Sequence, residues 1–187
     1  MAITLDGTNG ITAQAIDLVT PLPQIDGGTG ASAKIVQGTV VASTSGTSIT
    51  FTGIPSWAKR ITVMFNAVST SGTANYVIQV GSGSITTTGY VGGAGVVAAG
   101  GASGGSYTNG YNIQLGVAAA LMSGLMTINL ISGTTYVANF SGGSNTTNFA
   151  LVGGGTVTLG SVLDRVNITT SNGTDTFDAG SINIMYE

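Results

Sequence analysis

Short segments in which apolar and polar residues alternate with period two fill most of this chain from Lys34 onward. β-branched and aromatic residues alternate with Thr, Asn and Gln, which is typical of strands with one buried and one exposed face. Gly, Ser and Asn separate these segments, and Ala118 to Ala120 give helix propensity only near 117–122. The sequence therefore predicts an all-β fold, an antiparallel, jelly-roll-like β-sandwich. The predicted strands are 35–41, 48–52, 60–68, 75–80, 110–115, 125–130, 135–140, 147–151, 156–159, 165–169 and 181–186.

The side chains that carry most enzyme chemistry are missing from this chain. Its 187 residues include no His and no Cys, and only 6% of them are charged. His moves protons near neutral pH, and Cys is the readiest thiol nucleophile and metal ligand. The net charge of −3 provides no basic field for nucleic acid. We therefore expect a protein that is not an enzyme, with no catalytic residue, cofactor, metal or nucleic-acid partner.

The chain is unusually apolar for a protein whose whole surface faces water. Its mean hydropathy is +0.42, and 42% of its residues are hydrophobic. The longest apolar stretch, 116–131, is interrupted by polar residues and falls short of the roughly 20 apolar residues that span a bilayer as a helix. We expect a protein that is not membrane-embedded, in which identical copies cover one another's apolar sheet faces.

Residues 1–33 differ in composition from the rest of the chain. They hold three of the seven acidic residues and two of the three prolines, and they lack a long apolar alternation. Prolines impose extended geometry, and the run 26–30 is a turn or flexible joint. We expect an extended N-terminal attachment arm over 1–33 and a head domain over 34–187. The arm residues of interest are Asp6, Pro21, Pro23, Gly27, Gly28 and Gly30.

A glycine-rich stretch, 89–110, contains nine glycines. Glycine is costly to order inside a strand, so this stretch is predicted to be a long surface loop, with a recognition loop as the sharper alternative. Tyrosine offers a stacking face and a hydroxyl to a sugar. The receptor-contact candidates are Tyr90, Tyr107, Tyr111 and Asn109, with Tyr76 also considered. The single tryptophan, Trp57, is predicted to plug one end of the sandwich, with sugar stacking as its alternative.

Three carboxylates near the C-terminus, Asp164, Asp175 and Asp178, could supply a catalytic pair, and Asp175 with Asp178 could bind Ca²⁺. Asp164 lies beside Arg165 and is expected to pair with it at a strand end, whereas Asp175 and Asp178 flank Phe177 in a predicted turn. Glycoside hydrolysis needs two carboxyl groups at a fixed separation, and the sequence supplies nothing that fixes one. Two carboxylates without the dense EF-hand spacing do not indicate calcium. We assign these residues no catalytic or metal-binding role.

Several segments resemble tail fibre proteins of tailed bacteriophages. The run 23–31, Pro-Gln-Ile-Asp-Gly-Gly-Thr-Gly-Ala, resembles a Gly-Gly-Thr-Gly element that recurs in these fibres, and the opening run 3–11 is also similar. The blocks 53–65 and 163–187 look like parts of fibre C-terminal head domains, whereas 82–160 departs from the pattern. The resemblance implies a homotrimer on the virion, made in the bacterial host cytoplasm, with an N-terminal attachment region and a C-terminal receptor-binding head.

The leading hypothesis is a virion structural protein, a short tail fibre or fibre tip whose head contacts a host cell-surface glycan or outer-membrane receptor. Its other partners are two copies of itself and a virion protein gripped by the arm. The second hypothesis is a capsid decoration or head-fibre protein anchored to the shell by the arm. The third is a carbohydrate-degrading tailspike, which requires the carboxylates to act as a catalytic pair.

Overall fold

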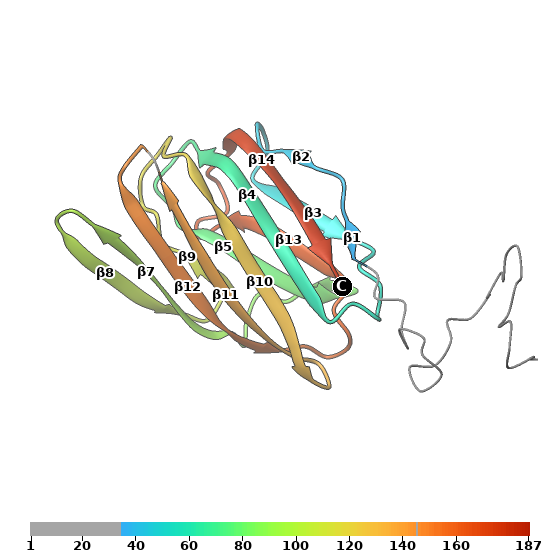
Figure 1. Cartoon of the computed structure of the whole chain (residues 1–187). Coiled ribbons are helices and arrows are strands. Elements are labelled where there is room, and N and C mark those ends of the chain that lie inside the picture. The colour runs from blue at the N-terminus through green and yellow to red at the C-terminus, as the bar shows by residue number, and fades with distance from the viewer. Residues whose placement is uncertain (1–34, 145) are drawn as a thin grey trace, which may run out of the picture. The chain divides into compact units, whose positions relative to one another are not determined.

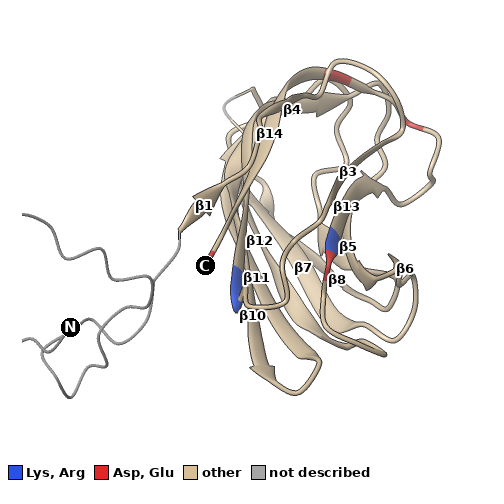
Figure 2. Cartoon of the chain, turned by 90° about the vertical axis from the view of Figure 1, so that its right-hand side faces the viewer, with Lys and Arg blue, Asp and Glu red and all other residues tan. Residues whose placement is uncertain are grey.

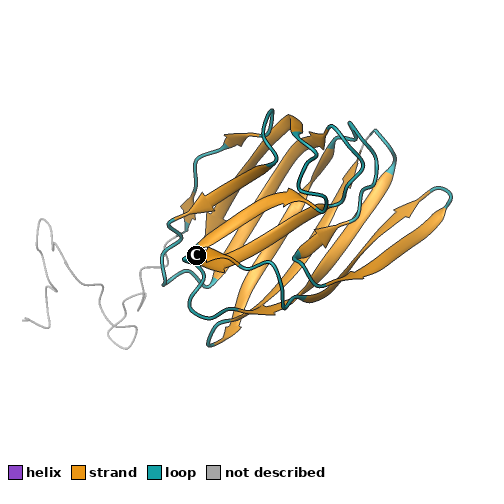
Figure 3. Ribbon diagram, turned by 180° about the vertical axis from the view of Figure 1, so that it is seen from behind, coloured by secondary structure: helices purple, strands orange, loops and turns teal. Residues whose placement is uncertain are grey.

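The computed structural model describes residues 35–144 and 146–187, which form fourteen antiparallel strands in two sheets. No helix occurs in these ranges (Figure 3). The all-β, antiparallel prediction is confirmed, and two sheets around one core are consistent with a β-sandwich. The homotrimer and the attachment arm remain predictions. The arm residues that lie outside the described ranges are Asp6, Pro21, Pro23, Gly27, Gly28 and Gly30.

The larger sheet has nine strands in the order β1-β14-β4-β10-β11-β12-β7-β8, with β2 paired to β14 (Figure 1). Its long central strands stay in register over most of their length, so the β10–β11 and β11–β12 pairs are extended hairpins. The strand bounds are β1 (Val36–Gln37), β2 (Val41–Ala42), β4 (Arg60–Thr70), β7 (Val91–Ala98), β8 (Gly101–Tyr107), β10 (Met122–Ser132), β11 (Thr135–Ser144), β12 (Phe149–Thr158) and β14 (Phe177–Tyr186).

The smaller sheet has five strands in the order β3-β13-β5-β6, with β9 paired to β5. Strand β9 also packs against β12 and β7 of the larger sheet, which joins the two sheets on that side of the core. The strand bounds are β3 (Ser48–Thr52), β5 (Tyr76–Ser82), β6 (Ser84–Ile85), β9 (Tyr111–Ile113) and β13 (Arg165–Thr170).

The core lies between the inner faces of the two sheets. The alternation predicted for β3 is visible as burial, because Ile49 and Phe51 are buried while their neighbours in the strand are exposed. In the larger sheet Phe65 and Phe140 pack edge to face with ring centroids 5.9 Å apart. Buried apolar surface of this kind is the main stabilising contribution to such a fold.

Two strand predictions were wrong in their extent. The expected strand 35–41 is reduced to β1 and β2, because the side chain of Asn183 enters the pairing and donates to Gly38 O at 3.0 Å. The two strands expected at 147–151 and 156–159 are instead one strand, β12, that runs through Gly153–Gly155. Backbone pairing with β11 and β7 on both sides holds those glycines in the sheet.

Two further predictions are corrected. The stretch 117–122 is not a helix, because Ala119 has a φ of 57°, which a right-handed helix excludes. The stretch 89–110 is not a long loop, because it forms the β7–β8 hairpin at the left of Figure 1. Over residues 35–144 and 146–187 we find no helix long and apolar enough to cross a membrane.

Candidate functional site

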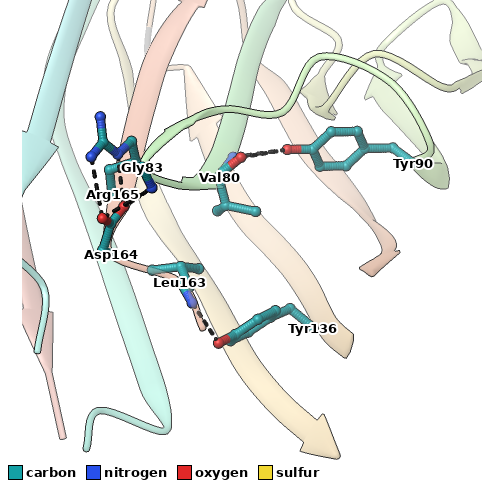
Figure 4. A network of polar contacts seen from close by, with 7 residues as sticks. All are labelled: Val80, Gly83, Tyr90, Tyr136, Leu163, Asp164 and Arg165. Carbon is teal, nitrogen blue, oxygen red and sulfur yellow. Dashed lines mark hydrogen bonds and ion pairs between the residues drawn. The ribbon is translucent and has the colours of Figure 1, made fainter. Parts of the chain in front are cut away.

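Two of the four predicted receptor-contact residues are buried in the core. Tyr90 and Tyr111 are each 1% exposed and pack edge to face with ring centroids 5.1 Å apart. The Tyr90 hydroxyl accepts a hydrogen bond from Val80 N at 2.8 Å (Figure 4). Burial raises the pKa of Tyr90 to about 12 and raises that of Tyr111 further. The contact prediction for Tyr90 and Tyr111 was therefore wrong, since neither ring can reach a ligand; Tyr76, 1% exposed, is buried likewise.

The other two candidates, Tyr107 and Asn109, are half-buried and lie at the connection between β8 and β9. The hydroxyl of Tyr107 accepts a hydrogen bond from Asn75 Nδ2 at 3.2 Å. Gln79 Nε2 donates to the backbone carbonyl of Asn109 at 2.9 Å, and Asn112 Nδ2 donates to its Oδ1 at 3.0 Å. These contacts tie both residues into the framework, while the O–H of Tyr107 and the side-chain nitrogen of Asn109 keep the capacity to donate.

Trp57 does not plug the sandwich, so that prediction was wrong. The indole is 41% exposed and lies against Tyr186, with ring centroids 5.7 Å apart. It belongs to the end of the head at which the described chain begins, because Tyr186 pairs with Val36. We call this the Ile35 end.

The three carboxylates are each engaged with partners of their own. Asp164 Oδ1 accepts from Arg165 Nε at 2.7 Å, and Asp164 also accepts from Gly83 N (Figure 4). The Arg165 guanidinium lowers the pKa of Asp164, and the hydrogen bond from Asn172 lowers that of Asp175. Both carboxyl groups are therefore ionised at neutral pH, which suits an ion pair or a turn and not a general acid. Asp178 accepts a hydrogen bond from Ser69.

A cavity of about 540 Å³ opens at the opposite end of the larger sheet. It lies where β10 and β12 begin and β11 ends, and we call it the end pocket. Its volume falls in the range of roughly 300–1,000 Å³ that small-molecule sites occupy. The residues that line it are Leu121, Ser123, Gly143, Ser144, Asn148, Phe149 and Ala150.

The register of the sheet places the end pocket far from the Ile35 end. Strand β4 pairs with β14 through Ile61 and Tyr186 at one extreme, and with β10 through Val68 and Met122 at the other. The stretch from Ile61 to Val68 spans roughly 23 Å at about 3.3 Å per residue. The pocket and Ile35 therefore lie at opposite ends of the larger sheet.

A β-bulge between β4 and β10 lies next to the end pocket at Ser123. The β4–β10 pairing shifts between Met122 and Gly124, and Ala67 in β4 has a φ of 50°. An alanine in this left-handed region is strained, and Ser123 Oγ stabilises it by accepting a hydrogen bond from Ala67 N at 2.9 Å. Ser123 follows the bulge in β10 and is one of the residues that line the pocket.

The rim of the pocket is fixed by polar contacts. Leu121 N donates to Thr146 Oγ1 at 3.1 Å, and the hydroxyls of Ser144 and Thr146 are 3.1 Å apart. Asn148 has a φ of 55°, a conformation that asparagine tolerates better than most residues. This end of the site is therefore held by short side-chain hydroxyls and by a left-handed backbone turn at Asn148.

No charged residue lines the pocket. The sequence contains no Asp, Glu, Lys or Arg between Arg60 and Asp164, and all seven lining residues lie in this stretch. Figure 2 shows how few segments of the described chain carry charge. Among the residues that the structure describes, no group of three or more acidic side chains is placed to hold a metal ion. The arrangement suits neutral ligands held by hydrogen bonds and apolar contact.

One signal for this site is visible in the sequence, the stretch from 61 to 163 that contains no charged residue. The register that brings Ser123, Gly143 and Ala150 into one row is not visible there. Comparisons with protein-family models, with curated proteins and with solved structures each return no match for this chain.

Proposed function

We propose that this protein is a non-enzymatic virion structural protein, a short tail fibre or fibre tip of a tailed bacteriophage. Its β-sandwich head contacts a host surface receptor of glycan type, and residues 1–33 attach it to another virion protein. The observation that carries the proposal is a difference between the two ends of the head. The Ile35 end exposes large apolar side chains beside the Arg60–Glu187 ion pair, whereas no charged residue lines the end pocket opposite it.

The Ile35 end supports assembly. It exposes Ile35 at 63%, Trp57 at 41% and Ile131 at 60% of their surface. Ile131 belongs to the same end because Leu130 N donates to Lys59 O at 2.8 Å, and Lys59 N bonds to Glu187 O. Large apolar side chains gathered on one surface favour an interface between chains. We propose that three copies join at this end of the head.

The opposite end supports recognition. Loops on a rigid sandwich are common places for binding residues, and the end pocket is formed where such loops meet the ends of β10, β11 and β12. The bacteriophage assignment itself comes from the resemblance of 3–11, 23–31, 53–65 and 163–187 to tail fibre segments.

Two measurements test this function. Analytical ultracentrifugation of the full chain is expected to give a species of about 55 kDa, three times the 18.4 kDa of one chain. Excess purified full chain, incubated with susceptible bacteria, is expected to reduce adsorption of the particle that carries it. A stable monomer that binds no bacterial surface contradicts the proposal.

A further inference from the structure

We propose that the end pocket is the receptor-binding site and that it holds a neutral saccharide unit, to the exclusion of acidic sugars and phosphates. The inference rests on the proposed function, since it specifies where the head meets its receptor and which receptor chemistry it accepts. It replaces the tyrosine candidates, two of which are buried.

The pocket combines the two kinds of surface that a sugar ring requires. Leu121, Phe149 and Ala150 supply apolar carbon, against which the C–H groups of a pyranose can pack. Ser123, Ser144 and Asn148 supply hydroxyl and amide groups around the same cavity. Ligand sites typically pair a mostly apolar lining with a few polar groups that fix orientation.

These polar groups retain hydrogen-bonding capacity. Ser123 Oγ accepts from Ala67 N, so its own O–H is left to donate to a ligand. The side-chain amide of Asn148 forms no hydrogen bond within residues 35–144 and 146–187, and it offers both donors and an acceptor. Saccharide hydroxyls both donate and accept, so they match this set.

The absence of charge in the lining determines which sugars are accepted. A carboxylate or phosphate in the pocket meets no Lys or Arg, since none of the lining residues is charged. An anion bound there gains no charge-assisted hydrogen bond from a cationic side chain. A neutral hexose loses only hydroxyl–water hydrogen bonds, which Ser123 and Asn148 can replace.

The site is also built before the ligand arrives. The hydrogen bond from Ala67 N to Ser123 Oγ, the left-handed turn at Asn148 and the Ser144–Thr146 contact hold the lining in place. Preorganisation lowers the entropic cost of binding, which matters for ligands as small and polar as a single sugar unit.

The test is a titration of the ¹⁵N-labelled full chain, followed by TROSY NMR, with methyl glycosides of glucose, galactose, mannose and N-acetylglucosamine. Glucuronic acid and N-acetylneuraminic acid are the charged probes. We expect at least one neutral glycoside to shift the amide signals of Ser123, Ser144 and Asn148, while both acids bind at least tenfold more weakly.

Two variants with matched controls locate the site. Asn148→Gly keeps the left-handed φ and removes only the side-chain amide, and Ala150→Ile fills the cavity from an exposed strand position. The control for Asn148→Gly is Ala119→Gly, at another exposed position with a left-handed φ, 57°. The control for Ala150→Ile is Ala102→Ile, which makes the same change two strands away in the same row of the sheet. We expect the first pair to weaken glycoside binding at least tenfold and the controls to leave it unchanged.

The inference is overturned if no neutral glycoside binds, if the shifted signals lie away from the pocket, or if an acidic sugar binds as well as the neutral ones. Each of these results leaves the proposed function standing if the full chain still blocks particle adsorption. Failure of adsorption blocking together with mapped glycoside binding instead removes the fibre assignment and keeps the saccharide site.

Discussion

Strands β14, β4, β10 and β11 fill the core with large side chains, whereas the middle of β12 and the facing part of β7 in the same sheet present glycine and alanine to it. One inner row crosses both halves. It runs through Ile184, Val63, Met126 and Phe140, and continues through Gly153 and Ala94. A Cβ atom on Gly153 would lie 2.5 Å from Asn112 O in β9, so the backbone of the other sheet occupies the space of a side chain there.

This difference shows that two kinds of packing can build one sheet. In the first half, burial of apolar side chains selects the strands, and their alternation is visible in the sequence. In the second half, the backbone of β9 comes so close to β12 that Gly153 has no room for a side chain. Strand β12 forms there because it pairs with β11. Large buried side chains near the glycine-rich strands are supplied by Tyr90 and Tyr111, which lie next to these strands in the sequence and pack against each other.

The largest expected effect comes from removing bulk in the first half. Phe140 is 2% exposed and packs against Phe65, so Phe140→Ala leaves a cavity and lowers the free energy of unfolding by about 3–5 kcal/mol. Urea titration followed by tryptophan fluorescence measures it. The neighbouring Ser141 is exposed, and Ser141→Ala is expected to change stability by less than about 0.5 kcal/mol. Equal effects of the two variants would contradict the division of the sheet.

The second effect tests the tyrosines that support the glycine half. Burial raises the pKa of Tyr90 from 10.0 to about 12, so the unfolded chain releases this proton first as pH rises. The stabilisation is complete below pH 10 and is lost as pH rises through about 12, by about 3 kcal/mol. Urea midpoints measured from pH 8 to 12 are expected to fall above pH 10, and to fall less steeply in Tyr90→Phe. An identical slope in both proteins would show that Tyr90 is not buried.

The third effect adds bulk where the backbone approaches closely. Gly153→Ala forces apart β12 and β9, and overpacking of this kind costs about 1–3 kcal/mol. Thermal unfolding by circular dichroism measures the loss. An unchanged melting temperature would mean that β9 can move away at little cost, and that packing does not require the glycines of β12.

The smallest effect has the opposite sign and serves as the matched control. A Cβ atom on Gly100, at the tip of the β7–β8 hairpin, meets nothing within 4 Å. Gly100→Ala is therefore expected to raise the free energy of unfolding by about 0.4–1 kcal/mol, because it restricts the unfolded chain. The same thermal scan checks it, and destabilisation as large as that of Gly153→Ala would remove the contrast between the two glycines.

The two halves also differ in how far the sequence could predict them. The strand Ser48–Thr52 was predictable because alternating burial leaves a period-two pattern. The strand Arg165–Thr170 alternates apolar and polar residues in the sequence, although its polar Asn167 and Thr170 are buried as well. The β7–β8 hairpin was not, because Gly, Ala and Ser carry little strand propensity and only the register with β12 reveals their pairing.

The candidate site was less predictable than the fold. Aromatic side chains near glycines indicated Tyr90 and Tyr111, but the same apolar area that suits a sugar also suits a core. The end pocket depends on a bulge at Ala67 and on the row that joins Ser123, Gly143 and Ala150. Both arise from pairing between strands far apart in the chain, which local sequence does not encode.

The most direct test of the central proposal is electron microscopy of intact particles labelled with an antibody against residues 35–187. A receptor-binding head on a short fibre predicts label at the tail, with three copies of the head to each labelled fibre. Label distributed over the capsid lattice would contradict the tail fibre assignment and would favour a decoration protein of the shell.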